Sequence, residues 1–294
     1  MNEKIGGVIA AVPTAFDVHG EPDVARFAGH CEWVLANGGD GLNILGSTGE
    51  ANSQSMASRA LVMKAGAAFK NAGRMVGTGT PSLTETIELT QLAADLGYDA
   101  ALVLPPYYYK PITDEGLFDY FATLIRSVDG IEIYLYNFPQ LTGMRFSFEL
   151  VERLIESFPG RLCGMKDSSG ELEYTDKMAS QFAGSFRVFP GSEGPLPDAV
   201  EKGYAGCISA TANATVKQAA QVWRTRDDLA NDDVVTLREL RGAIQVLPMV
   251  PAIKQLVSMR TQDTNWLNML LPFKPLAGEQ LSAVEAIAAQ LGYG

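Results

Sequence analysis

A lysine lies where a buried strand is predicted to end. Residues 162–170 read LCGMKDSSG, an apolar run that finishes at Lys166. Because side chains alternate between the two faces of a strand, Lys166 points to the same side as Leu162 and Gly164. A lysine amine in water at neutral pH is almost fully protonated, and burial favours its neutral, nucleophilic form. Lys166 is therefore a candidate for imine formation with a carbonyl substrate.

A second interpretation of Lys166 is structural. A lysine at a strand end can extend its long stem to solvent, or its ammonium can pair with the neighbouring Asp167. Lys166 alone does not separate these possibilities.

A tyrosine ends the preceding predicted strand. Tyr136 closes the run IEIYLYN (131–137), where it shares a face with Tyr134, opposite Ile133 and Leu135. Its phenol can transfer protons beside Lys166, or its ring can fill the interior of the fold.

A turn rich in small polar residues, GSTGE (46–50), follows another apolar run. The hydroxyls and backbone N–H groups of Ser47 and Thr48 can bind a carboxylate, although such a turn can also serve only to cap a helix. A nucleophilic lysine, a proton-transferring tyrosine and an anion-binding turn together are the groups that imine catalysis on a 2-oxo acid needs.

We expect no cofactor and no metal. Imine chemistry requires neither, and the two histidines, His19 and His30, lack partners at metal-ligand spacing. Both are interpreted as solvated or core polar residues.

Eight short apolar, β-rich runs recur along the chain and alternate with helical patterns. The predicted strands lie at 8–16, 41–46, 75–79, 100–106, 131–137, 162–166, 186–191 and 205–210. Strand–helix alternation indicates parallel strands, and eight such units match an α/β (βα)8 TIM barrel. From about Trp223 the pattern is helical throughout. We therefore predict a barrel over residues 1–222 and a C-terminal helical extension of the same domain over 223–294.

Polar and aromatic residues cluster at the predicted strand ends. In a TIM barrel the carboxyl ends of the strands and the loops after them form the active site. GSTGE, PPYYYKP (105–111), YNFPQLTG (136–143), Lys166, GSEGP (191–195) and ISATAN (208–213) all fall at such ends. We expect them to share one rim.

Composition excludes several classes of partner. The 294 residues are 47% hydrophobic and carry a formal net charge of −11 without a basic run, so no nucleic-acid partner is expected. No apolar stretch reaches the roughly 18 residues of a membrane span. Three widely spaced cysteines, Cys31, Cys163 and Cys207, fit a reducing compartment. The expectation is a soluble cytoplasmic protein.

Five of these segments, in this order, carry a family resemblance. GSTGE, the PYY of PPYYYKP, YNFPQLTG, GMKDSSG (164–170) and GCISATAN (206–213) resemble the dihydrodipicolinate synthase / N-acetylneuraminate lyase family of class I pyruvate-dependent aldolases. The resemblance implies that Lys166 forms the Schiff base and that Tyr136 relays protons. It also implies that Ser47, Thr48 and Gly49 form the carboxylate-binding turn, and that the carbonyl of Ile208 faces the lysine.

The resemblance extends to assembly. In this family a second tyrosine, matched here by Tyr108, enters the site from a neighbouring subunit, and Ser47 links it to Tyr136. The family is mostly tetrameric, as a dimer of dimers, so a homotetramer is expected.

Departures from the family pattern bear on the substrate. The lysine-biosynthetic synthases have an arginine where this chain has Leu141, and an isobutyl group cannot bind the carboxylate of aspartate semialdehyde. The segment instead resembles that of the sugar-acid aldolases. Glu193 matches a carboxylate that binds substrate hydroxyls in the neuraminate lyases, although it can also be a solvated loop residue.

These observations lead to one hypothesis and several alternatives. The hypothesis is a lyase that reversibly cleaves a 2-keto-3-deoxy sugar acid, or a related 4-hydroxy-2-oxo acid, into pyruvate and an aldehyde. Alternatives that use the same lysine are a synthase-like condensation of pyruvate with an aldehyde, and a dehydratase or deaminase. A more distant one is a non-catalytic 2-oxo acid binder.

Overall fold

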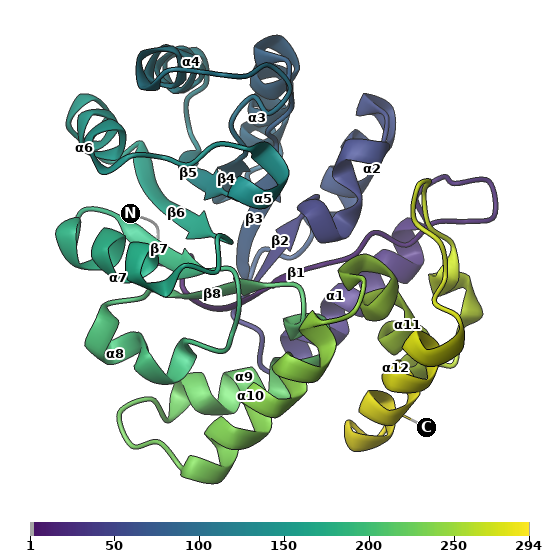
Figure 1. The fold of residues 1–294 in the computed structure, drawn as a ribbon. Coiled ribbons are helices and arrows are strands. Elements are labelled where there is room, and N and C mark those ends of the chain that lie inside the picture. Colours follow the sequence, from purple (N-terminus) through teal and green to yellow (C-terminus); the bar gives the residue numbers. More distant parts are fainter. Residues whose placement is uncertain (1–2, 294) are drawn as a thin grey trace.

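Eight parallel strands form a nearly closed barrel at the centre of the protein (Figure 1). The computed structural model describes residues 3–293. Neighbouring strands pair in the order β7-β6-β5-β4-β3-β2-β1-β8, and Ala205, just before β8, donates its N–H to the carbonyl of Val188 in β7 at 3.0 Å. The strands are β1 Gly7–Ala11, β2 Gly41–Ile44, β3 Gly73–Gly77, β4 Ala100–Val103, β5 Glu132–Asn137, β6 Leu162–Asp167, β7 Arg187–Pro190 and β8 Gly206–Ser209. The predicted TIM barrel is confirmed.

Side chains on the two faces of the strands build two separate apolar clusters. The inner cluster fills the barrel and includes Ile9, Tyr134, Tyr136 and Ile208. The outer cluster lies between the strands and the surrounding helices. Since both faces are buried, the strands have the continuous apolar character from which they were predicted. The inward direction expected for Tyr136 is confirmed.

Helices surround the barrel and begin at polar caps. Asp23, Ser55, Ser82, Thr113 and Ser147 each accept a backbone N–H of the first turn of their helix. The helices are α1 Val24–Ala36, α2 Met56–Gly66, α3 Leu83–Asp95, α4 Asp114–Ser127, α5 Pro139–Thr142, α6 Phe148–Ser157, α7 Leu172–Gln181, α8 Ala199–Lys202 and α9 Ala212–Arg224, with 3-10 turns η1 Ser47–Gly49, η2 Ala51–Ser53 and η3 Leu196–Asp198.

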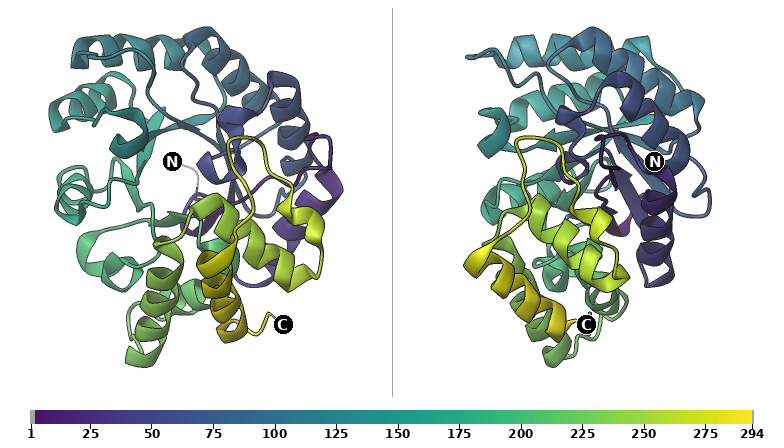
Figure 2. Two further views of the ribbon diagram at one scale, coloured as in Figure 1. Left: turned by 45° about the vertical axis from the view of Figure 1, so that its right-hand side comes forward. Right: turned by 90° about the vertical axis from the view of Figure 1, so that its right-hand side faces the viewer.

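The C-terminal segment packs as a helical group on one side of the barrel (Figure 2). It contains α10 Asn231–Gln245, α11 Met249–Thr261, the 3-10 turn η4 Thr264–Leu267 and α12 Gly278–Gln290. The predicted boundary at 222/223 falls inside α9, which belongs to the eighth strand–helix unit. All nine residues from Val250 to Ser258 in α11 are buried, so the extension is continuous with the barrel core.

Within residues 3–293, no helix is both long enough and apolar enough to cross a membrane. The three cysteines are buried and free, and burial raises the pKa of each thiol, that of Cys163 to about 12. His19 is exposed, whereas His30 in α1 is buried.

His30 links α1 to the extension. Its Nδ1 lies 2.9 Å from Nη2 of Arg260 in α11, and its Nε2 lies 2.8 Å from Oδ1 of Asn213 in α9. Because the guanidinium can only donate, Nδ1 accepts and the proton is on Nε2. Burial lowers the pKa of His30 from 6.5 to about 3; the Asn213 hydrogen bond opposes this shift and the charge of Arg260 adds to it.

The neutral state of His30 predicts a loss of stability in acid. Below pH 6.5 the imidazole of the unfolded chain binds a proton, whereas His30 in the folded protein stays neutral down to about pH 3. The contribution of His30 to the unfolding free energy is therefore fully present above pH 6.5 and is lost as the pH falls from 6.5 to about 3. The loss is about 1.4 kcal/mol per pH unit. Between pH 7 and pH 5 the wild type should therefore lose about 2 kcal/mol more unfolding free energy than His30→Gln in urea titrations. Equal losses in the two proteins would contradict this assignment.

Candidate active site

The ends of β5 and β6 bring Lys166 and Tyr136 together. The two residues are register partners in the parallel ladder. Nζ of Lys166 donates to the phenol oxygen of Tyr136 at 3.2 Å and lies 4.5 Å from the centre of its ring. Both side chains are almost fully buried. The amine therefore lies beside a group that can accept or return a proton.

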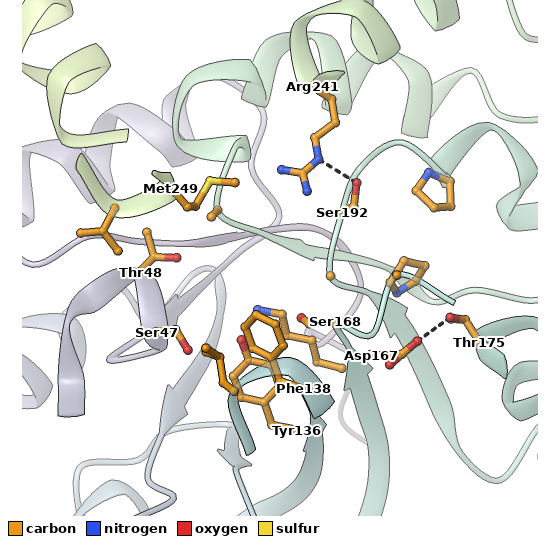
Figure 3. Close-up of a pocket in the computed structure, with 18 of the residues that line it drawn as sticks. Ser47, Thr48, Tyr136, Phe138, Asp167, Ser168, Thr175, Ser192, Arg241 and Met249 are labelled. Carbon is orange, nitrogen blue, oxygen red and sulfur yellow. Dashed lines mark hydrogen bonds between the residues drawn. The ribbon is translucent and has the colours of Figure 1, made fainter. Parts of the chain in front are cut away.

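Asp167 is not an ion-pair partner of Lys166. Strand alternation directs its carboxylate to the other face of β6, where Asn137 Nδ2 donates at 2.7 Å and Thr175 Oγ1 at 2.5 Å. Ser169 adds its backbone N–H and its hydroxyl. These four donors satisfy the carboxylate, so the salt-bridged interpretation of Lys166 is wrong. Figure 3 shows Asp167 turned towards Thr175.

A cavity of about 390 Å³ opens above Lys166 and Tyr136. Ser47 and Thr48, in the turn after β2, line it from the other side (Figure 3). The Ser47 hydroxyl is buried and has no hydrogen-bond partner in the described chain. An unpaired buried hydroxyl is unfavourable in the free protein and is available to a ligand.

The extension supplies one wall of this cavity. Arg241 of α10, Met249 and Val250 of α11, and Phe273 all line it. Sequence reasoning missed every one of them. Arg241 in particular places a guanidinium in a site whose loop position 141 lacks one.

Three further predicted residues occupy different places. Leu141 lines the cavity and is 58% exposed, so it lies at the rim. Gly49 and Ile208 are buried and are not among the lining residues. The carbonyl of Gly49 accepts from Thr14 and Gln54, which fixes the turn that presents Ser47 and Thr48.

Glu193 does not lie where a substrate-binding carboxylate was expected. It is fully buried, and it is absent from the cavity lining. Its carboxylate accepts from Ser209 Oγ and Thr211 Oγ1 at 2.5 Å and from Thr215 Oγ1 at 2.8 Å. In this structure, hydroxyls of the protein itself occupy the positions that substrate hydroxyls were expected to take.

Tyr108 is outside the cavity of its own chain. It is 74% exposed and packs edge-to-face against the equally exposed Tyr109, with ring centroids 5.1 Å apart. Within one chain, Tyr108 contacts neither Lys166 nor Tyr136.

A buried ion pair anchors the turn after β2 to the extension. Glu50, directly after Gly49, pairs with Lys254 of α11, and both side chains are completely buried. Lys254 Nζ also donates to the Asn268 carbonyl at 2.8 Å, and Leu270 N–H donates to Glu50 at 2.7 Å. Burial raises the pKa of Glu50 and lowers that of Lys254, and the attraction between the two opposes both shifts. Glu50 has φ of 55°, a left-handed conformation that this pairing helps to maintain.

Comparison with known proteins decides the family. A model of the dihydrodipicolinate synthetase family matches residues 4–291. The chain belongs to this family. Members of the dihydrodipicolinate synthetase family are pyruvate-dependent lyases and synthases, which supports an enzyme of this class.

Relatives within the family carry different names. An uncharacterized DapA-like lyase of Chloroflexus aurantiacus is 32% identical over 287 residues, covering 95% of each chain. A 4-hydroxy-tetrahydrodipicolinate synthase of Thermus thermophilus is 35% identical over 217 residues, covering 73% of this chain and 71% of the other. Among solved structures, YagE from E. coli K12, a prophage protein of the dihydrodipicolinic acid synthase family in complex with pyruvate, superposes with a TM-score of 0.91 at 27% identity and 99% coverage of both chains.

No cluster of three or more histidine, cysteine, aspartate or glutamate side chains suited to a metal occurs in residues 3–293.

The unpaired hydroxyl of Ser47 predicts opposite effects on stability and activity. Ser47→Ala removes a buried polar group without a partner, so the melting temperature should stay the same or rise. The loss of one hydrogen bond to a charged substrate group should lower kcat/KM by about 10- to 100-fold. Ser55→Ala is the matched control, because it removes the α2 cap and should cost about 1 kcal/mol while leaving activity intact.

The Glu50–Lys254 pair predicts a strong and partly reversible destabilisation. Lys254→Met leaves the Glu50 carboxylate buried without its partner and should lower the unfolding free energy by about 3–5 kcal/mol. Adding Glu50→Gln removes the uncompensated charge and should restore at least half of the loss, as measured by urea denaturation. A double variant no more stable than Lys254→Met would contradict this account.

Proposed function

We propose that this chain is a class I lyase that reversibly cleaves a 2-keto-3-deoxy sugar acid, or a related 4-hydroxy-2-oxo acid, to pyruvate and an aldehyde. The observation that carries the proposal is the 3.2 Å contact between Lys166 Nζ and the Tyr136 phenol at the base of a cavity lined by Ser47 and Thr48. Membership of a family of pyruvate-dependent enzymes supports it, as does the pyruvate complex of YagE.

The chemistry follows from these positions. The neutral amine of Lys166 attacks C2 of the 2-oxo acid to give a carbinolamine, Tyr136 donates its phenolic proton to the departing hydroxyl, and loss of water gives an iminium. The Tyr136 oxygen, now deprotonated, accepts the proton of the C4 hydroxyl while the C3–C4 bond breaks. The aldehyde departs, and the bonding electrons form an enamine on the lysine. Protonation of the enamine at C3 and hydrolysis of the imine release pyruvate and regenerate the amine.

The turn after β2 is assigned to the C1 carboxylate. Ser47 and Thr48 line the cavity across from the Tyr136 side (Figure 3), and their hydroxyls can hydrogen-bond both carboxylate oxygens. A carboxylate fixed there presents C2 to the amine, which converts a bimolecular attack into an intramolecular one.

Leu141 argues against aspartate semialdehyde as the aldehyde partner. It lies at the cavity rim, where its isobutyl group offers no donor to a carboxylate. A dehydratase or deaminase would form the same imine but release no pyruvate. Assaying the product mixture for both pyruvate and a longer 2-oxo acid separates the two reactions.

Tyr108 is proposed to act across a subunit boundary. Its 74% exposure leaves the ring free to enter the cavity of a neighbouring copy, in a homotetramer built as a dimer of dimers. The localisation proposed for the enzyme is cytoplasmic.

The proposal predicts a covalent adduct on one lysine. Incubation with pyruvate and sodium borohydride should increase the intact mass by one reduced pyruvate, and peptide mapping should locate it on Lys166. Lys166→Ala should form no adduct and should lose activity by about a thousandfold or more.

Lys64 is the matched control for this experiment. It is exposed on α2, and Lys64→Ala should retain both the adduct and full activity. A folded wild-type protein without an adduct would refute imine catalysis and favour a non-catalytic 2-oxo acid binder.

A further inference from the structure

One guanidinium in the cavity has no role in the proposed imine chemistry. Arg241 belongs to α10, a helix of the extension, and it is half-buried. Figure 3 shows its side chain projecting from α10 towards the cavity, on the side away from Tyr136. The cavity extends from Lys166 to this guanidinium, since both residues line it.

Two hydroxyls hold the guanidinium in place. Arg241 Nε donates to Ser192 Oγ at 2.9 Å, and Nη1 donates to Thr211 Oγ1 at 3.0 Å. Ser192 follows β7 and Thr211 follows β8, so α10 is tied to the loops of two adjacent strands. The planar group therefore has a fixed orientation.

Glu193 explains why Thr211 is an acceptor for Arg241. The Thr211 hydroxyl has one hydrogen, which it donates to the Glu193 carboxylate at 2.5 Å. Its lone pairs are left for Arg241. Glu193 also accepts from Ser209 and Thr215, so its oxygens are occupied by hydroxyls instead of by the guanidinium.

Arg241 forms no direct ion pair within residues 3–293, and the Thr211 hydroxyl separates its guanidinium from the Glu193 carboxylate. Its neighbour Arg238 on the same helix forms an ion pair with Asp198 at 3.3 Å, whereas no ion pair of Arg241 is formed among residues 3–293. Of the five N–H groups of a guanidinium, the two hydroxyls use two. The remaining three are available to a ligand in the cavity.

The chemistry of this position favours a carboxylate. A guanidinium binds a carboxylate through two parallel hydrogen bonds, and one positive charge balances one carboxylate. A phosphate ester carries up to two negative charges, and Arg241 is the one arginine among the cavity-lining residues that the structure describes. The neighbouring wall, Met249, Val250 and Phe273, offers no side-chain donor that could supplement it.

We infer that Arg241 binds a second carboxylate at the far end of the substrate, so that the substrate is a 2-oxo dicarboxylic acid of the deoxy aldaric type. This inference rests on the proposed function, because Lys166 and the turn after β2 define the near end. Arg241 is then a specificity-determining residue. Arg241 reaches the cavity from α10, not from the loop that carries Leu141.

Binding of two matched ligands tests the inference. 2-Oxoadipate and 2-oxohexanoate have the same chain length and differ in a terminal carboxylate or methyl group. By isothermal titration calorimetry the wild type should bind 2-oxoadipate at least about tenfold more tightly. Arg241→Met should weaken the binding of 2-oxoadipate, so that the two dissociation constants differ by no more than about threefold. The dissociation constant of pyruvate should stay within about twofold of the wild-type value. Arg241→Lys should retain part of the preference.

Arg238→Met is the matched control, since it removes an exposed arginine from the same helix and should retain the full preference. Equal weakening of pyruvate and of both six-carbon ligands by Arg241→Met would overturn the inference in favour of a purely structural arginine. Equal binding of 2-oxoadipate and 2-oxohexanoate by the wild type would also overturn the inference. Tighter, Arg241-dependent binding of 2-keto-3-deoxy-6-phosphogluconate than of 2-oxoadipate would assign the position to phosphate instead.

Lys166→Ala separates this inference from the proposed function. If wild-type protein forms no borohydride adduct but Arg241 still discriminates the two ligands in the Lys166→Ala background, imine catalysis fails and the second carboxylate site stands. If the wild type forms the adduct but binds 2-oxoadipate and 2-oxohexanoate equally well, imine chemistry stands and the second carboxylate site fails.

Discussion

The buried pair of Glu50 and Lys254 is the fully buried ion pair that connects the barrel with the C-terminal extension. It connects the turn after β2 with α11, at a point where neither side chain reaches solvent. Ions in such surroundings are tolerated only when each is paired and hydrogen-bonded, and the Asn268 carbonyl and the Leu270 N–H complete the set. The extension therefore packs directly against the turn that lines the cavity, and Arg241, Met249 and Phe273 of the extension line the same cavity.

Strand alternation separates two kinds of polar group at the end of β6. Lys166 faces the barrel interior and contacts Tyr136, whereas Asp167, one residue later, faces outward and is satisfied by four donors. The strand therefore leaves the lysine beside a phenol and places the carboxylate among its own donors.

Local periodicity was sufficient for the barrel and for the contact between Lys166 and Tyr136. Strands buried on both faces appear as continuous apolar runs, and the two-residue repeat placed both side chains on the inner face. The repeat was wrong for Leu162, because a register irregularity at the start of β6 puts Leu162 in the outer cluster and Cys163 in the inner one. The same reasoning could not place Arg241, because α10 carries charges of both signs and reads as a solvated helix. Its position depends on how α10 packs against the loops after β7 and β8. The burial of Glu193, which contradicts a solvated loop residue, was not predictable for a similar reason: Thr211 and Thr215, which approach it in space, lie in a different unit of the chain.

The location of each site residue divides the protein into positions that tolerate change and positions that do not. Lys166 and Tyr136 lie on buried strands within the inner core, where a change of volume is felt by the whole barrel. Leu141 and Arg241 lie at the rim, partly in contact with solvent, and contribute little to core packing. Substitutions at the rim should therefore change stability less than substitutions in the inner core. A library randomised at these two positions would be expected to yield mostly folded variants with altered substrate range.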